Sequence, residues 1–221
     1  ISDFANFNDS FSCEVEINGK GLKDLAVNYP FVFEVNEVEQ IQGIVGSSNE
    51  FDFAEIEITA PDDDCISIGV IDSGVAEGNK YIESAIEHHK SISYVESDPS
   101  TADKVSGGGH GTRVAGAILF PKGVSNLDSP YQLPFKIRNL KVLDNASKLQ
   151  NKYPAKLMEQ IVQDNEDCTI YNLSINSKAP YRIKHMSSWA STLDKLIHSE
   201  NLLFLVSAGN IEPIFISWYL R

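Results

Sequence analysis

The stretch Ile68-Gly-Val-Ile-Asp-Ser-Gly-Val75 continues an apolar run that begins at Ile66. A short, nearly continuous apolar run closed by turn residues is typical of a strand that is buried on both faces of a parallel sheet. Asp72 comes at the carboxyl end of this strand, where functional side chains gather in open α/β sheets. A part-buried carboxylate is costly without a partner. An aspartate that bonds only to its own turn is the alternative.

Elements of alternating type follow this strand along the chain. Strands that alternate with helices indicate an α/β fold, in which helices cover both faces of a parallel sheet. The pattern predicts helices over 113–120, 155–165 and 187–199, and strands over 137–143, 168–173 and 202–206. The helix faces expected to be buried are Leu157, Ile161 and Val162, and then Trp189, Leu193, Leu196 and Ile197.

Residues 1–61 have a different pattern from the rest of the chain. Apolar and polar residues alternate over 13–17, 31–35 and 56–58, which is the period of a half-buried strand, whereas residues 22–29 have helical spacing. The sequence therefore predicts a small α+β unit, built as strand, helix and strand, that precedes and packs on the α/β part.

The join between the two parts is acidic. Asp62–Asp64 follows Pro61, and we expect it to be a solvated linker that leads into an α/β domain over 65–221. Adjacent carboxylates can also bind calcium, but an acidic run is more often simply solvated.

The charge of the chain excludes two classes of partner. The net charge is −13 and the pI is near 4.7, so phosphate backbones and anionic membrane surfaces would be repelled. No apolar run approaches the length of a membrane span. We expect neither a nucleic acid nor a membrane among the partners.

The cysteines predict neither a disulfide framework nor a metal site. Cys13, Cys65 and Cys168 are odd in number and far apart, which favours buried free thiols in a reducing compartment. His88 and His89 would point about 100° apart on a helix, so they do not form a metal pair. We therefore predict no metal-binding residues here, and surface positions for these two histidines.

His110 lies in Gly107-Gly-Gly-His-Gly-Thr-Arg-Val-Ala-Gly116, where a helix is expected to begin. Glycines on both sides let another backbone approach the imidazole closely. A helix N-terminus disfavours an imidazolium, so a histidine that accepts a proton there needs an anionic partner, and Asp72 is the candidate. A surface histidine is the alternative. A dinucleotide-binding GxGxxG loop would need glycine at Thr112, and there is no Walker lysine.

Asn210 closes the stretch Leu202-Leu-Phe-Leu-Val-Ser-Ala-Gly-Asn210, again at the carboxyl end of a predicted strand. Its side-chain amide could donate a hydrogen bond to a developing oxyanion. Taken alone, an asparagine at this place is better explained as a turn residue.

Four segments together resemble the subtilisin-like serine peptidases, or subtilases. They are Val70-Ile-Asp-Ser-Gly74, Gly109-His-Gly-Thr-Arg-Val-Ala-Gly116, Tyr171-Asn-Leu-Ser-Ile175 and Ser207-Ala-Gly-Asn210, and the resemblance covers roughly residues 65–210. The histidine segment is the most specific of the four. The resemblance implies a subtilisin-like fold, here incomplete, and a Ser-His-Asp mechanism. In that mechanism Asp72 would orient the base, His110 would take the serine proton, and Asn210 would help to bind the oxyanion.

The resemblance also implies how a polypeptide substrate would bind. It would lie as an extended strand between residues 147–153 and the segment Leu173, Ser174, Ile175 and Asn176. Asn176 and Ser177 stand where the family usually has glycines, so a side chain there could narrow the primary specificity pocket. Calcium is a candidate ligand, as in many subtilases, and no other cofactor is expected.

The family's nucleophile lies in a Gly-Thr-Ser-x-x-Ala type of motif downstream of the oxyanion asparagine. Eleven residues follow Asn210, and their one serine, Ser217, lacks that context. Ser187, Ser188 and Ser191 precede Asn210 and are interpreted as surface residues of a helix. We therefore expect an inactive fragment of a serine endopeptidase whose serine lies outside this chain. The alternative is a peptide-binding scaffold of subtilase type that has lost its nucleophile.

Residues 1–61 resemble, in place and shape, the propeptide-type domain that precedes many subtilases. The chain also resembles a branch of intracellular bacterial subtilases, some of which are encoded beside an ATPase. An ATPase is therefore a candidate partner and the cytoplasm is favoured, but the chain begins with Ile1, so a missing signal peptide excludes nothing. A nucleotide-binding α/β domain is a third hypothesis. It would need its glycine loop directly after the first strand, whereas over thirty residues separate Asp72 from the glycines.

Overall fold

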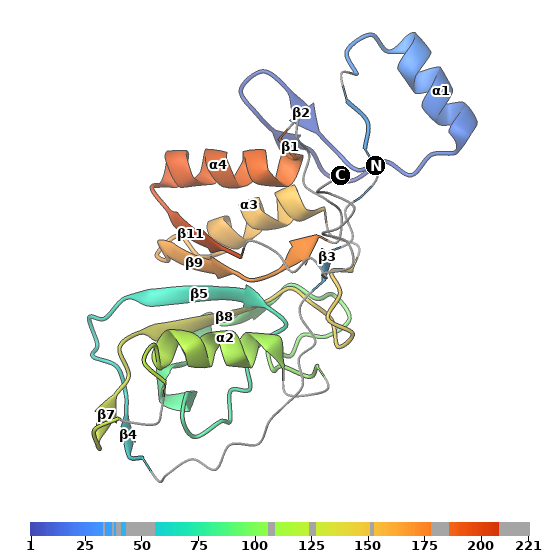
Figure 1. Ribbon diagram of the computed structural model, residues 1–221. Coiled ribbons are helices and arrows are strands. Elements are labelled where there is room, and N and C mark those ends of the chain that lie inside the picture. The colour runs from blue at the N-terminus through green and yellow to red at the C-terminus, as the bar shows by residue number, and fades with distance from the viewer. Residues whose placement is uncertain are drawn as a thin grey trace, which may run out of the picture.

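The computed structural model describes residues 1–32, 34–36, 38, 41–42, 56–105, 109–123, 127–150, 153–177 and 186–207. Its centre is a five-stranded parallel sheet with the strand order β11-β9-β5-β8-β6 (Figure 1). The strands are β5 (Ser67–Asp72), β6 (Ile92–Ser93), β8 (Lys136–Lys141), β9 (Ile170–Leu173) and β11 (Leu203–Val206). The chain thus has the predicted α/β fold with a parallel sheet.

Helices cover both faces of this sheet, as expected. Helices α3 (Pro154–Asp164) and α4 (Ser188–Glu200) pack side by side on one face, and α2 (His110–Leu119) packs on the other (Figure 1). In the α/β part the predicted helices and strands are all present, with ends shifted by a few residues. Two 3₁₀ turns, η1 (Glu83–Ala85) and η2 (His88–Lys90), were not predicted from the sequence.

Each face of the sheet has its own hydrophobic core. Leu157, Ile161 and Val162 of α3 are buried, as their spacing predicted. On α4, Leu193 and Leu196 are buried and Trp189 packs beside them. Ile197 is 39% exposed, so its predicted burial is wrong. The core under α2 contains Val70 of β5, Ala115 and Leu119 of α2, and Ile137 of β8.

β5 lies in the middle of the sheet, between β8 and β9. Its residues alternate between the two cores, Val70 toward α2 and Ile71 toward α3 and α4. A Cβ atom at Gly69 would lie 2.6 Å from the Tyr171 ring, so the glycine lets this ring pack across the strand. The ring also stacks on Phe204 of β11, with the centroids 5.0 Å apart. The central position of β5 places Asp72 at the middle of the sheet's carboxyl edge.

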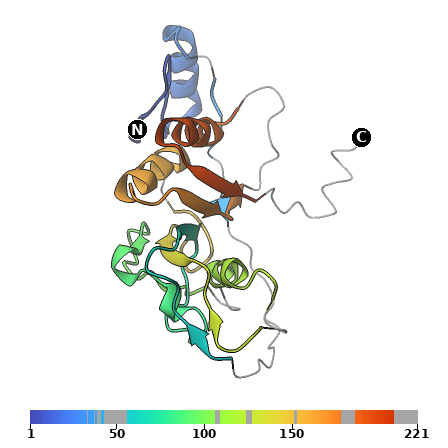
Figure 2. The ribbon, with the colours of Figure 1, turned by 90° about the vertical axis from the view of Figure 1, so that its left-hand side faces the viewer.

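The N-terminal part differs most from the prediction. Helix α1 (Gly19–Asn28) is present, with the Asn18 side chain capping its start. The predicted strands over 13–17 and 31–35 are wrong for the described residues, because no neighbouring strand pairs with them. Helix α1 has no buried residue and projects from the rest of the molecule (Figures 1 and 2).

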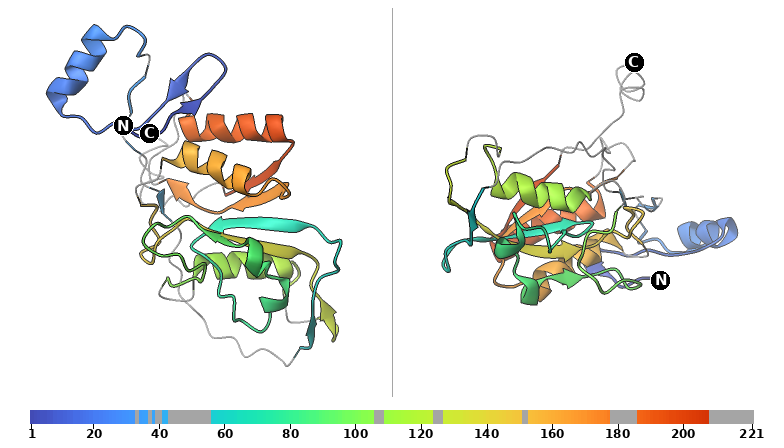
Figure 3. Two further views of the ribbon diagram at one scale, coloured as in Figure 1. Left: turned by 180° about the vertical axis from the view of Figure 1, so that it is seen from behind. Right: turned by 90° about the horizontal axis from the view of Figure 1, so that it is seen from below.

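A short hairpin, rather than α1, attaches the N-terminal part to the α/β part. It is formed by β1 (Ala5–Asn6) and β2 (Phe11–Ser12). Lys195 of α4 donates a hydrogen bond to the Asn6 carbonyl (2.9 Å), and the hydroxyls of Ser12 and Tyr153 are hydrogen-bonded to each other. Seen from behind, the hairpin lies beside the N-terminal end of α4 (Figure 3).

Two further short strands join parts that are distant in the sequence. β3 (Ile41–Gln42) pairs antiparallel with β10 (Asn176–Ser177), and β4 (Ile58–Thr59) pairs in parallel with β7 (Tyr131–Gln132). β4 thus pairs with the α/β part, although its residues precede the predicted boundary.

The acidic join is exposed but anchored. Asp62–Asp64 is exposed, as expected of a solvated run. Gln132 donates to Oδ1 of Asp62 (2.8 Å), and Lys136 donates to the main-chain carbonyl of Asp63 (2.5 Å). These bonds hold the run against the start of β8, so it is not a free tether.

The cysteines are free thiols, but only Cys168 is buried. The predicted burial of Cys13 and Cys65 is wrong, since both lie on partly exposed segments. His88 and His89 are exposed, as expected. Within the described ranges, no helix has the length and apolarity needed to cross a membrane.

Candidate active site

The Asp72 carboxylate is fully buried at the end of β5 and has two defined partners. Its Oδ1 accepts the N–H of Ser73 (2.7 Å), and its Oδ2 lies 2.8 Å from Nδ1 of His110. The main-chain oxygen of Asp72 accepts the N–H of Val142 (2.8 Å), which fixes the strand end to the residue after β8. Because this carboxylate is fully buried, it interacts with the imidazole at low local dielectric.

His110 reaches Asp72 because α2 begins directly against the turn that follows β5. The N–H of Gly111 donates to Oγ of Ser73 (3.2 Å). A Cβ atom at Gly111 would lie 2.2 Å from the carbonyl oxygen of Gly74 and 3.1 Å from Cβ of Asp72. Only glycine permits this approach, so the glycine after the histidine has the role expected from the sequence.

The surroundings of His110 raise the pKa of its imidazole above the ordinary value. The hydrogen bond that the imidazole donates to Asp72 is the largest cause of the raised pKa, partial burial opposes it, and the charge of Asp72 adds to it. The charge of Arg113 lowers the pKa and that of Asp103 raises it, both by less. The side chain is 13% exposed, so a reacting group can reach the ring. The protonated imidazole is therefore held more firmly here than in a free histidine, as suits a group that must accept a proton.

The segment expected to bind substrate lies at the same edge of the sheet. Leu173 pairs with Ile71 and Val206, next to Asp72. The side chains of Leu173 and Ile175 are buried in the core, so in this segment only Ser174 and Asn176 have side chains available to a ligand.

The two available side chains already have partners. Ser174 Oγ donates to Oδ1 of Asn172 (2.7 Å), and Oδ1 of Asn176 accepts a hydrogen bond from Oγ of Ser207 (3.0 Å). The N–H of Ser207 donates to the carbonyl of Leu173 (3.2 Å). The residue after β11 is thus fixed to this segment.

Ile41 occupies the space between the two predicted peptide-binding segments. Its carbonyl accepts the N–H of Leu149 (3.2 Å), and its backbone pairs with Ser177 of β10. Its side chain is only 2% exposed and belongs to the core under α3 and α4. Sequence reasoning missed this residue, because a two-residue strand leaves no periodic signal. An extended backbone therefore fits between these segments, and here the chain itself supplies it.

The predicted oxyanion donor and the serine that follows it are both at the end of the chain. Asn210 and Ser217 lie outside the described residues. Ser187 accepts the N–H of Ala190 (3.2 Å) as the N-cap of α4, while Ser188 and Ser191 lie in its first turns and are partly exposed.

No metal site was found among the described residues, where no three His, Cys, Asp or Glu side chains are arranged to hold an ion. Oδ1 of Asp62 accepts a hydrogen bond from Gln132, and its two neighbours do not converge with it. The acidic run therefore does not fit a calcium site in this arrangement.

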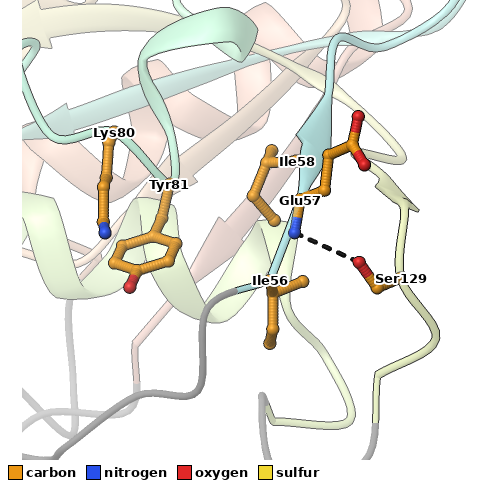
Figure 4. Close-up of a pocket in the computed structure, with 6 residues that line it drawn as sticks. All are labelled: Ile56, Glu57, Ile58, Lys80, Tyr81 and Ser129. Atoms are coloured by element: carbon orange, nitrogen blue, oxygen red, sulfur yellow. Dashed lines mark hydrogen bonds between the residues drawn. The ribbon is translucent and has the colours of Figure 1, made fainter.

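A hollow of about 500 Å³ lies elsewhere on the molecule, beside β4. It is lined by Ile56, Glu57, Ile58, Lys80, Tyr81 and Ser129 (Figure 4). The Lys80 ammonium lies 4.9 Å from the centre of the Tyr81 ring, and Ser129 accepts the N–H of Glu57 (3.3 Å). Neither Asp72 nor His110 lines this hollow, so it is separate from the candidate active site.

Comparison with known proteins identifies the family. The model of the subtilase family matches residues 63–217, whereas a comparison with curated proteins finds no match. A solved structure described as a cold-adapted subtilisin-like serine proteinase is similar at 20% identity and a TM-score of 0.46, over 69% of this chain and 50% of that chain.

A second similar structure is the epidermin leader peptide processing serine protease of Staphylococcus aureus, at 14% identity and a TM-score of 0.43, over 68% of this chain and 38% of that chain. The chain spans half or less of the length of these two proteins. The family match covers both Asp72 and His110. The chain belongs to the subtilase family of serine proteases.

Proposed function

We propose that this chain carries the acid and base of a serine endopeptidase active site, and that residues beyond it supply the serine. The contact of 2.8 Å between Asp72 and His110 is the observation that carries the proposal. Asp72 holds Nδ1 of the imidazole, so Nε2 is the nitrogen left to take a proton. The buried carboxylate would stabilise the imidazolium that forms.

The proposed reaction begins with a serine hydroxyl next to Nε2 of His110. As its oxygen attacks the carbonyl carbon of a peptide bond, the hydroxyl proton passes to Nε2 and a tetrahedral oxyanion forms. The C–N bond then breaks, and the proton passes from Nε2 to the departing amine. Water hydrolyses the acyl-enzyme by the same route in reverse. Asn210 is the proposed side-chain donor to the oxyanion.

The proposed substrate is an extended polypeptide. Its backbone would lie between Leu149 and residues 173–176, beside the place where β3 pairs with Asn176 and Ser177. Main-chain hydrogen bonds of this kind do not depend on which side chains the peptide carries, so peptides of many sequences can form them. Asn176 stands where the family usually has glycine, and its side chain accepts a hydrogen bond from Ser207 at the edge of this place. We therefore expect it to restrict the size of the residue bound nearest to it.

The test compares the 221-residue chain with a longer product of the same gene that carries a Gly-Thr-Ser block. Both are treated with a fluorophosphonate probe, which acylates activated serines, and assayed on an unfolded protein. We expect labelling and hydrolysis only in the longer form, because loss of the nucleophile in such a triad lowers kcat about a million-fold. Asp72→Asn and His110→Ala should abolish labelling there.

A peptide-binding scaffold without a nucleophile is the second candidate, and the Ile41 backbone, which already lies between Leu149 and β10, favours it. In that case, no product of the gene carries the serine block, and no form reacts with the probe. Labelling of the 221-residue chain at Ser187, Ser217 or any other serine would show that the nucleophile has been misplaced.

A further inference from the structure

A second carboxylate, that of Asp103, lies at the beginning of α2. Its Oδ2 accepts two hydrogen bonds from Thr112, one from the main-chain N–H (3.3 Å) and one from Oγ1 (3.0 Å). Its Oδ1 accepts the N–H of Val105 (3.2 Å). Thr112 is the third residue of a helix whose first residue is His110. Asp103 therefore satisfies one of the N–H groups that a helix leaves free at its start.

The residue at the N-cap position cannot make this bond. Gly109 is the N-cap of α2 and has no side chain to accept a hydrogen bond. A Cβ atom on Gly109 would lie 1.7 Å from Oδ2 of Asp103, and Gly109 has a φ of +46°. The carboxylate thus packs directly against the residue that precedes His110. It acts as a cap from a different loop.

The loop that carries Asp103 is itself fixed to the strand end. The N–H of Val75 donates to the carbonyl of Thr101 (3.3 Å), and the N–H of Asp103 donates to the carbonyl of Val75 (3.2 Å). Oγ1 of Thr112 also accepts the N–H of Ala76 (2.9 Å). The turn after Asp72 and the first turn of α2 are therefore both bound to the loop around Asp103.

A buried lysine anchors this loop from the sheet. Lys141, at the end of β8, is fully buried, and its ammonium donates to the carbonyl of Ala102 and to Oδ2 of Asp98, each at 3.0 Å. A buried ammonium needs these acceptors, so the two hydrogen bonds tie the loop to the end of β8. Asp103 is thus held on a rigid support.

The charge of Asp103 favours the protonated form of His110, in addition to the hydrogen bonds by which Asp103 holds the start of α2. A helix N-terminus carries partial positive charge and opposes an imidazolium at its first residue. A carboxylate in the first turn offsets this effect. The charged groups that act on His110 are Asp72 and Asp103, which favour the imidazolium, and Arg113, which disfavours it.

We propose that Asp103 is a second anionic positioning residue for His110. Through Thr112 and Gly109 it holds the start of α2 against the turn after Asp72. Its charge supports the imidazolium that forms when His110 takes a proton. The claim that Asp103 positions α2 rests on the contacts alone. The claim that it supports proton transfer to His110 rests on the proposed function.

The test needs no activity, because the imidazole can be titrated in this chain by NMR with ¹⁵N-labelled histidine. Asp103→Asn keeps the shape and one acceptor oxygen but removes the charge. Asp64→Asn removes the same charge from the exposed acidic run and is the matched control. We expect the pKa of His110 to fall in Asp103→Asn and to change less in the control. Equal shifts in the two variants would overturn the proposal.

Asp72→Asn separates failure of this inference from failure of the proposed function. If the pKa of His110 falls in Asp72→Asn but not in Asp103→Asn, the acid–base pair stands and the inference about Asp103 is wrong. If neither variant lowers the pKa of His110, then Asp72 does not stabilise the imidazolium and the proposed function is wrong. In the longer, active form, Asp103→Asn should lower kcat with little change in KM and move the acidic limb of the pH profile to lower pH.

A further variant covers the case in which Asp103→Asn does not fold. Asp103→Glu keeps the charge on a longer side chain, so the pKa of His110 should stay closer to that of the unmodified chain than it does in Asp72→Asn. A fall as large as in Asp72→Asn, despite the retained charge, would contradict the proposal.

Discussion

Oδ2 of Asp72 lies 2.8 Å from Nδ1 of His110, although 38 residues separate the two in the sequence. The contact exists because a strand end and a helix start meet with almost no side chain between them. Gly111 has its Cα against the carbonyl of Gly74. The position of the base is therefore decided by backbone packing as much as by the ion pair itself.

The first prediction concerns the pH dependence of stability. The raised pKa of His110 means that folding favours its protonated form. Such a group contributes its full stability below the pKa of the unfolded state, which is about 6.5, and loses it as the pH rises through the higher folded pKa. His110→Gln should therefore cost most below about pH 6.5 and progressively less above it.

Urea unfolding of both forms across this pH range measures the difference. His198→Gln, on an exposed part of α4, gives the baseline for removing a histidine. A cost of His110→Gln that stays constant or grows with rising pH would show that the Asp72 contact does not favour the imidazolium.

The second prediction uses two glycines of one helix. Gly111→Ala places a methyl group 2.2 Å from the Gly74 carbonyl, so α2 must move away from β5. Overpacking of this kind typically costs about 1–3 kcal/mol, and it should lengthen the Asp72–His110 contact. Gly116→Ala has nothing within 4 Å and should gain about 0.5–1 kcal/mol from helix propensity.

Denaturant unfolding of the two variants gives the free energies, and the histidine NMR signals report on the contact. The pair of variants controls for helix propensity, since both make the same replacement in α2. If Gly111→Ala were as stable as Gly116→Ala, the close approach of helix and strand would be wrong.

The third prediction concerns the buried lysine of β8. Lys141→Met leaves Asp98 and the carbonyl of Ala102 without their shared donor and releases the loop around Asp103. Lys136→Met, at the partly exposed start of the same strand, loses a bond to the carbonyl of Asp63. Lys141→Met should lower the midpoint of unfolding more than Lys136→Met. Amide exchange in residues 101–105 should rise only in Lys141→Met.

Most of the sheet and the acid–base pair could be predicted from the sequence because they have local signals. Apolar runs and helical spacing are local, and the glycines around His110 indicate a close backbone approach. Ile41 gave no such signal, since its burial depends on Leu149 and β10, which are distant in the chain. Asp103 was missed for the same reason, because it caps a helix from another loop. The strands expected over 13–17 and 31–35 had the right period but no partner strand.

The last prediction concerns the groove between Leu149 and residues 173–176, which is the proposed place of the peptide. Ile41→Asp would bury a charge in the core and forfeit about 1.5–3 kcal/mol of hydrophobic burial, so β3 should leave its place between Leu149 and β10. A fluorescently labelled extended peptide should then bind more tightly, by about tenfold for each 1.4 kcal/mol of lost competition.

Val38→Asp is the matched control, because it places the same charge on the same segment at a residue that is 56% exposed. Fluorescence anisotropy on the 221-residue chain measures the affinities of both variants. Stronger binding in Ile41→Asp alone supports the groove between Leu149 and residues 173–176 as the place of the peptide. Equal binding in the two variants would mean that the peptide binds elsewhere, since β3 then would not compete with it.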